Sequence, residues 1–112
     1  PTVREPDGVA MSSRNAYLSE EERGQAPCLV TALRDAWRRF DEGERDVETL
    51  VAAAKEIVSA QPAARIDYVE IRDADTLEDV ATITDRAVMA LAVHVGNTRL
   101  IDNTVLGGDV RP

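Results

Sequence analysis

The side chains with the clearest chemistry lie together at positions 12–14, in the order Ser-Ser-Arg. The adjacent serines carry hydroxyl groups that can each donate one hydrogen bond. Arg14 adds a planar, permanently charged guanidinium, which matches the oxygens of a phosphate group. Gly8, shortly before them, allows the backbone a sharp bend or a close approach to a ligand. These residue types in this order indicate a loop that binds phosphate.

The surroundings of this tripeptide favour an anion but do not require one. Ser19 and Glu22 form a capping-box pattern, which predicts that a helix begins just after the loop. Free backbone N–H groups at the start of a helix attract negative charge. Residues 1–18 contain two arginines and two acidic residues, so this segment is neutral although the whole chain carries a net charge of −8. Similar tripeptides are common in solvated turns without a ligand, so the longer sequence has to decide.

The longer sequence carries a family resemblance. Residues 4–18 read Arg-Glu-Pro-Asp-Gly-Val-Ala-Met-Ser-Ser-Arg-Asn-Ala-Tyr-Leu, which closely resembles the start of the C-terminal domain in the pantothenate synthetase (pantoate–β-alanine ligase) family. The Ser-Ser-Arg loop of that family is the counterpart of the mobile KMSKS loop of class I aminoacyl-tRNA synthetases. Three later strings, at residues 43–46, 71–77 and 99–103, also resemble the family and follow its order. The resemblance therefore covers nearly the whole chain.

The resemblance implies a chemical role for the loop. Enzymes of this family use ATP and Mg²⁺ to convert pantoate to pantoyl-adenylate with release of pyrophosphate. β-Alanine then attacks the adenylate, giving pantothenate and AMP. By resemblance, Ser12, Ser13 and Arg14 bind the ATP phosphates and support the transition state. Met11 positions the loop, and the main chain of Val3 contacts the adenine edge.

The same resemblance implies that this chain is one domain of a larger enzyme. The family's N-terminal nucleotide-binding domain, with its HIGH-type histidine motif and pantoate-binding glutamines, has no counterpart in these residues. We therefore expect residues 1–112 to be the C-terminal lid domain, with no complete catalytic site and no ligase activity alone. Its expected partners are its own N-terminal domain and, in the full enzyme, ATP, pantoate and β-alanine. The full-length enzyme is expected to form a homodimer through the missing domain.

Composition excludes several other classes of function. The chain has 13 Lys and Arg against 21 Asp and Glu, so it lacks the basic surface needed for nucleic acid or an anionic membrane. Cys28 and His94 are the only cysteine and histidine, and the acidic clusters lack a recognised ligand spacing, so no disulfide and no metal site is expected. His94 is expected at the rim of a strand. Without a signal peptide or an apolar span, a cytoplasmic location is expected.

The hydrophobic pattern predicts helices in residues 19–62. Apolar residues recur at helical spacing from Ala26 to Phe40 and again from Val47 to Val58. Pro27 interrupts the first stripe, and either ends a short helix or kinks a longer one. Gly43 ends the first stripe, Asp46 is the expected N-cap of the next helix, and the pattern stops before residue 62. These residues indicate a helical hairpin. Its aromatic residues, Trp37 and Phe40, are expected to pack in the core, as is Tyr68 further on.

Residues 66–106 change to strand periodicity. Strands are expected at residues 66–72, 86–95 and 98–105, with residues 96–97 as a tight hairpin turn. The middle strand is apolar on both faces, which favours a central position, whereas the order beyond the last hairpin stays open. Residues 73–85 are expected to be a polar connection with a helical turn near 75–77. We expect residues 107–112 to fray without packing partners and residues 5–16 to be mobile.

Together these patterns predict an α+β fold in which a helical hairpin packs on a small, three-stranded antiparallel sheet, with residues 1–18 as the nucleotide-phosphate loop. A second interpretation is a non-catalytic α+β module for protein association, because the same elements would serve it. Such a module would bind itself or a partner without nucleotide. A lid domain would be monomeric, bind ATP weakly and support ligase activity only when joined to its other half.

Overall fold

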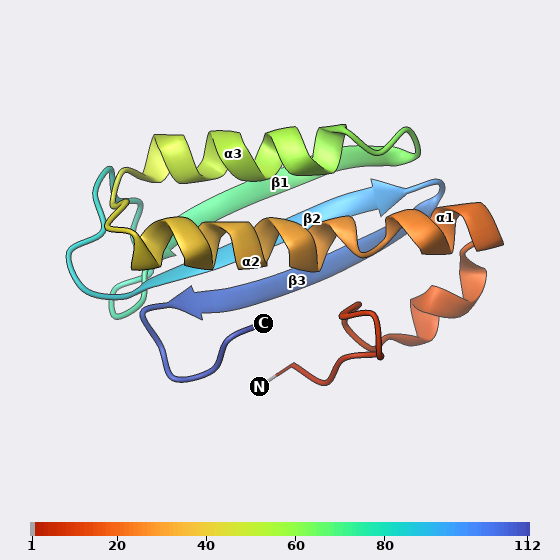
Figure 1. Cartoon of the computed structure of the whole chain (residues 1–112), viewed down its shortest axis with the longest axis horizontal. Helices are drawn as coiled ribbons and strands as arrows, with labels where there is room; N and C mark the ends of the chain where they lie inside the picture. Colours follow the sequence, from red (N-terminus) through yellow and green to blue (C-terminus); the bar gives the residue numbers. More distant parts are fainter. Residues whose placement is uncertain (1) are drawn as a thin grey trace.

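Two long helices cover one face of a sheet in the computed structural model, which describes residues 2–112 (Figure 1). Helices α2 (Cys28–Asp41) and α3 (Val47–Ser59) form an antiparallel hairpin. Strands β1 (Ala64–Asp73), β2 (Ala87–Val95) and β3 (Thr98–Leu106) form one antiparallel sheet in the order β1-β2-β3. Helix α3 lies over β1, and α2 lies over β3. This arrangement confirms the predicted α+β fold.

Local capping signals set the helix boundaries. The short helix α1 (Glu20–Gln25) begins with the expected capping box, in which the backbone N–H of Glu22 donates to the Ser19 hydroxyl at 3.1 Å. Pro27 occupies the N-cap position of α2, so it separates two helices and does not kink a single one. Asp46 caps α3 and accepts a hydrogen bond from the Thr49 backbone N–H at 2.9 Å.

The core fills the space between the helical hairpin and the sheet. Leu33 of α2, Leu50 of α3 and Leu91 of β2 are at most 1% exposed. Trp37 is also buried, and its indole N–H donates to the Thr104 hydroxyl of β3 at 2.8 Å. Burying apolar side chains of this size is the main stabilising contribution to such a fold.

The strands pair along almost their whole length. β2 lies between β1 and β3, as its apolar character on both faces predicts. β1 contains a bulge between Ile66 and Tyr68, which adds one residue to this strand relative to its partner. Tyr68 is half-buried and lies outside the hydrophobic core, so the prediction that it packs in the core is wrong. The bulge changes the alternation of side chains along β1, which the sequence period alone does not show.

The connection between β1 and β2 is not merely polar. It starts with the expected helical turn, in which the Leu77 N–H donates to the Asp73 carbonyl at 2.9 Å. Further on, Ile83 is buried, and its backbone N–H donates to the Arg45 carbonyl at 2.8 Å. The Val47 N–H returns a bond to the Ala81 carbonyl at 3.0 Å. The connection is therefore tied to the start of α3.

The C-terminal residues have packing partners, contrary to the prediction that residues 107–112 have nothing to pack against. Arg111 donates to both carboxylate oxygens of Asp41, at 2.5 and 3.1 Å. Its guanidinium lies 4.4 Å from the centre of the Trp37 ring. Arg34 of α2 also donates to the Pro112 carbonyl at 3.1 Å. These contacts hold the tail beside α2, through pairings that cross 70 or more residues and that local composition cannot reveal.

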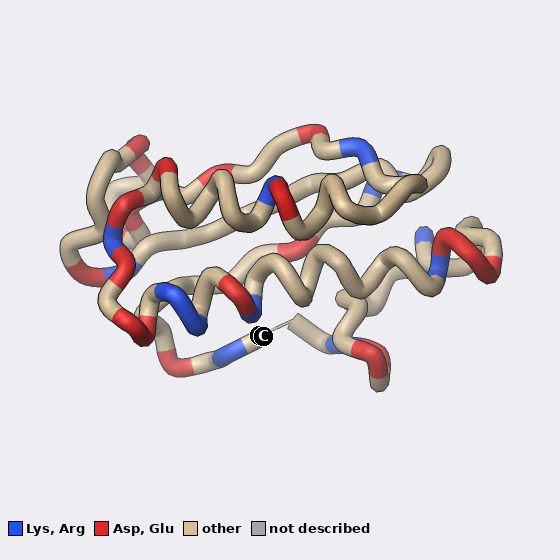
Figure 2. The backbone as a smooth tube through the Cα atoms, turned by 45° about the horizontal axis from the view of Figure 1, so that its top comes forward, with Lys and Arg blue, Asp and Glu red and all other residues tan. Residues whose placement is uncertain are grey.

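Charge is unevenly distributed over the surface. Figure 2 shows acidic residues at the start of α1 and at the opposite end of the molecule, around the α2–α3 turn and residues 73–85. Within residues 2–112, no group of three or more potential metal-ligating side chains comes together. None of the helices in that range combines the length and the apolar character needed to cross a membrane.

Candidate functional site

The segment before the Ser-Ser-Arg tripeptide folds back on itself. The Met11 N–H donates to the Val3 carbonyl at 2.9 Å, and the Glu5 N–H donates to the Val9 carbonyl at 2.8 Å. Gly8 makes the turn with φ +94°, and a Cβ atom there would lie 2.9 Å from a methyl carbon of Val30. A glycine is therefore required at this position for its backbone angle and also for its close contact with α2.

The tripeptide follows this folded segment directly. Ser12 has an extended backbone and is the N-cap of a short 3₁₀ helix, η1 (Ser13–Tyr17). Its hydroxyl accepts a hydrogen bond from the Arg14 backbone N–H at 3.1 Å. The Asn15 side-chain amide donates to the Ala10 carbonyl at 3.2 Å, which links η1 back to the loop. The expected helix start after the loop is therefore preceded by one further short helix.

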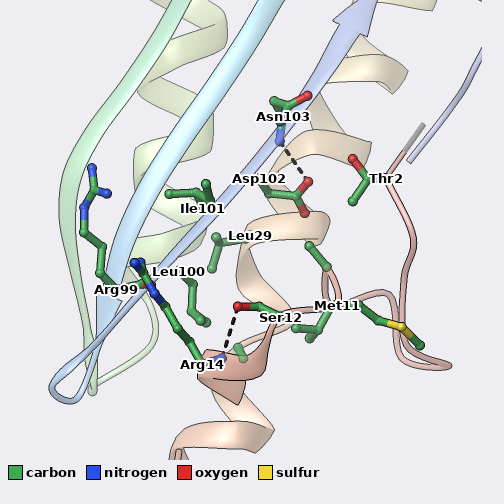
Figure 3. Close-up of a pocket in the computed structure, with 13 residues that line it drawn as sticks. Thr2, Met11, Ser12, Arg14, Leu29, Arg99, Leu100, Ile101, Asp102 and Asn103 are labelled. Atoms are coloured by element: carbon green, nitrogen blue, oxygen red, sulfur yellow. Dashed lines mark hydrogen bonds between the residues drawn. The ribbon is translucent and has the colours of Figure 1, made fainter. Parts of the chain in front are cut away.

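A pocket of about 440 Å³ lies between this loop and strand β3. Figure 3 shows Ser12 on the side of the pocket formed by the loop, and the Arg14 side chain extending from the loop toward Arg99 of β3. Of the five residues predicted to bind ATP, three line the pocket: Met11, Ser12 and Arg14. Ser13 and Val3 do not line it. Ser13 is exposed, and the Val3 side chain is 66% exposed.

Arg14 is distinguished by the partners of its guanidinium. Arg99, the other arginine that lines the pocket, pairs with Asp67 at 3.0 Å, and Arg4 pairs with the pocket residue Asp102. Arg14 instead donates one long hydrogen bond of 3.4 Å to the Arg99 backbone carbonyl. Among the residues that the structure describes, Arg14 has no carboxylate within 4.0 Å. Its positive charge is therefore not neutralised by an acidic neighbour.

Two ion-pair sites fix the loop to the rest of the chain, and sequence reasoning missed both. Arg4 makes a bidentate pair with Asp102 of β3, at 2.6 and 3.0 Å. Arg23 of α1 pairs with Glu5 and donates to both carboxylate oxygens of Asp7, at 2.7 and 3.0 Å. Hydrogen bonding to Arg23 lowers the pKa of Asp7 below its ordinary value of 3.8. The mobility expected for residues 5–16 stays a prediction, although Arg23 holds the side chains of Glu5 and Asp7.

Further pocket residues come from β3 and from the start of the chain. Figure 3 shows Thr2 and Asn103 close to Asp102, on the side of the pocket away from Arg14. Ile101 also lines the pocket and is 54% exposed. The only sequence signal for the β3 positions was the family string at residues 99–103, because nothing in local periodicity shows which strand faces the loop. No signal pointed to Thr2.

The sole cysteine does not offer a second reactive site. Cys28 is buried at the start of α2, and this burial raises the pKa of its thiol to about 11. At neutral pH the side chain is therefore a protonated, inert group, because the thiolate is the nucleophilic form. His94 is half-buried near the end of β2, where the sequence places it. The loop and its pocket remain the candidate site.

Comparison with known proteins identifies the family. A family model described as pantoate-beta-alanine ligase matches residues 1–105. The chain belongs to the pantoate–β-alanine ligase family. It is 55% identical over 107 residues to the pantothenate synthetase of Trichlorobacter lovleyi and 54% identical over 106 residues to that of Roseiflexus sp.. These matches cover 96% and 95% of this chain, respectively, but 38% of each relative.

Solved structures of pantoate–β-alanine ligases share the fold. The pantothenate synthetase of Thermus thermophilus superimposes with a TM-score of 0.85 at 39% sequence identity, over 93% of this chain and 37% of that one. A ligase from Francisella tularensis, complexed with beta-gamma ATP and beta-alanine, has a TM-score of 0.51 at 22% identity and supports the fold alone. The chain thus spans less than two fifths of the length of its relatives.

Proposed function

We propose that this chain is the lid domain of a pantoate–β-alanine ligase and that its Ser-Ser-Arg loop binds the phosphates of ATP. The observation that carries the proposal is Arg14, a pocket-lining arginine without a carboxylate partner among the described residues. Ser12 lines the same pocket, so a hydroxyl and a guanidinium are both available there. Serine hydroxyls and arginine forks are the side-chain donors that suit phosphate oxygens.

The proposal divides the chain into three parts. Residues 1–18 form the phosphate loop, residues 19–62 the helices and residues 66–106 the sheet that supports the pocket. The remainder of the ligase, an N-terminal nucleotide-binding domain, would supply the pantoate site, the catalytic histidine and the contacts of a homodimer. In this proposal Met11 keeps its positioning role. The adenine contact of the Val3 backbone requires closure against that domain, because Val3 lies outside the pocket.

Arg14 would act mainly in the first half-reaction. The pantoate carboxylate attacks the α-phosphorus of ATP, and negative charge builds on the departing pyrophosphate. Donors that are already aimed at this charge lower the barrier, because they need no reorganisation during the reaction. In the second half-reaction the β-alanine amine displaces AMP from the acyl group, so no pyrophosphate leaves. Mg²⁺ would be held by the ATP phosphates and the unmatched part of the ligase. Within residues 2–112, no three His, Cys, Asp or Glu side chains come together as a metal site.

The test uses a chimaera in which this chain replaces the matched 38% of the T. lovleyi enzyme. Arg14→Ala is expected to slow adenylate formation by about 10²–10³, the loss typical of one transition-state donor. Arg14→Lys should restore part of the rate, since a point charge does not reproduce the bidentate fork. Arg38→Ala, which removes an exposed arginine of α2, is the matched control and should leave the rate unchanged.

Single-turnover kinetics of the two half-reactions provide the measurement. Attack of β-alanine on preformed adenylate should be far less affected by Arg14→Ala than adenylate formation. Equal losses in both half-reactions would show that Arg14 supports the fold, and the phosphate assignment would then be wrong. Binding of this chain to itself or to another protein without nucleotide, together with an unimpaired Arg14→Ala chimaera, would favour the association module instead.

A further inference from the structure

The Arg4–Asp102 pair lies at the base of the phosphate loop. The Arg4 guanidinium donates to both Asp102 oxygens, at 2.6 and 3.0 Å. The Asp102 side chain is 1% exposed and that of Arg4 is 15% exposed. Asp102 Oδ1 also accepts the Asn103 backbone N–H at 2.8 Å, so the carboxylate is held rigidly on β3. A buried, bidentate pair of this kind fixes geometry much more strongly than a surface ion pair does.

Besides Asp102, the Arg4 guanidinium contacts the loop. The same guanidinium donates to the Gly8 carbonyl at the turn, at 3.0 Å. In the folded segment Arg4 lies opposite Ala10, and the Met11 N–H bonds to the Val3 carbonyl next to it. One arginine therefore joins the turn, the base of the loop and strand β3. Ser12 follows this base by one residue, so any movement at the base is passed to the tripeptide.

The pair joins the inward face of β3 to the loop. Asp102 lies on the inward face of β3, between Leu100 and Thr104, and is 4% exposed. Its partner belongs to the loop and to no helix or strand of the fold. Because Arg4 lies in the loop, breaking the pair is expected to free the loop, and a core amide shows whether the core opens as well.

We infer that Arg4 and Asp102 are positioning residues, which hold the phosphate loop against β3 so that Ser12 and Arg14 face the pocket. This inference rests on the proposed function of Arg14. Arg4 is not itself a phosphate-binding group, because its guanidinium is occupied by Asp102 and the Gly8 carbonyl. The pair acts through the loop, and its loss should displace the donors of the loop from their productive geometry. Small displacements of this kind reduce rates strongly.

The first test measures the loop in the 112-residue chain by backbone amide hydrogen exchange. Asp102→Asn removes the charge but keeps the shape, and is expected to raise the exchange rate of the Met11 amide at least tenfold. Asp41→Asn is the matched control, because Asp41 also accepts two bonds from one arginine but holds the C-terminal tail. It should leave the Met11 amide unchanged. The Leu91 amide in the central strand should be unaffected by either variant.

Two exchange results would overturn the inference. An unchanged Met11 amide in Asp102→Asn would show that the pair does not hold the loop. Equal acceleration at Met11 and Leu91 would show that the pair supports the whole fold. If Asp102→Asn does not fold, Arg4→Gln breaks the same pair from the more exposed side and is held to the same criteria. If neither folds, the pair is required by the fold itself and the inference is wrong.

The second test separates positioning from general destabilisation by a double-mutant cycle in the T. lovleyi chimaera. Asp102→Asn should slow adenylate formation roughly tenfold when Arg14 is present. In the Arg14→Ala background the same change should cost less than twofold, because the donor that it positions is already gone. If Asp102→Asn slows adenylate formation by the same factor with and without Arg14, the inference is wrong. If Arg14→Ala alone does not slow adenylate formation, the proposed function of Arg14 is wrong. The hydrogen-exchange result then still decides whether the Arg4–Asp102 pair holds the loop.

Discussion

Leu33→Ala tests the packing that supports the site. Leu33 lies on α2 and is fully buried, at 0% exposed, among α3 and the inward face of the sheet. Its replacement by alanine removes three carbon atoms, and about 0.8 kcal/mol per buried carbon gives a transfer loss of roughly 2.4 kcal/mol. A further cavity contribution applies because the helix and the sheet can collapse only partly around the gap. We therefore expect the free energy of unfolding to fall by about 3–5 kcal/mol.

Urea unfolding of the 112-residue chain provides the assay, with the fluorescence of the single tryptophan, Trp37, as the signal. With a slope of roughly 1–3 kcal/mol/M, this loss lowers the midpoint by more than about 1 M. Leu77→Ala is the matched control, since it makes the same chemical change at a side chain that is 57% exposed. It should change stability by less than about 0.5 kcal/mol. Equal losses for the two variants, or a loss below about 1 kcal/mol for Leu33→Ala, would refute the packing described here.

Two further predictions concern the loop. Gly8→Ala should destabilise the chain by about 1–3 kcal/mol, and by more than Gly43→Ala does. Both glycines have a positive φ, but only at Gly8 would a Cβ atom contact Val30. Identical losses of stability in urea unfolding would contradict this prediction. Arg23 lowers the pKa of Asp7. Their half-exposed pair should stabilise the folded chain by less than about 1 kcal/mol. This stabilisation is fully present above pH 3.8 and is lost as the pH falls through the lower pKa of the folded state. Asp7→Asn should therefore differ from wild type in thermal stability at neutral pH and converge with it in acid, and a difference that grows as pH falls would contradict this assignment.

Local sequence signals predicted the helical hairpin and the three strands but not the short helix η1. The Ser19 capping box and the Asp46 N-cap both lie at the helix starts that they predict. Strand β1 extends beyond the expected residues 66–72 to Ala64 and Asp73, because pairing with β2 adds residues whose own propensity is weak. The position of β1 beside β2 could not be derived from periodicity, which describes the faces of a strand but not its neighbours.

The site was only partly predictable, for a related reason. The residue types at positions 11–14 indicate the loop, and Met11, Ser12 and Arg14 do line the pocket. The opposite wall comes from β3, about 90 residues further along the chain. Contacts such as Arg4–Asp102 depend on the complete fold, so an arginine or aspartate in the sequence gives no sign of its partner. The same holds for Arg111, whose partners on α2 make the C-terminal residues part of the packed structure.

The distance in sequence between Arg4 and Asp102 also has a consequence for the order of events during protein synthesis. The two residues are 98 positions apart, whereas the strand pairings of β1, β2 and β3 join neighbours in the chain. A ribosome makes Arg4 first and adds Asp102 only when almost all of this chain has been made. Until β3 has formed, the loop has no carboxylate on which to dock. The nascent domain therefore completes its supporting layers before the loop can take the shape described here.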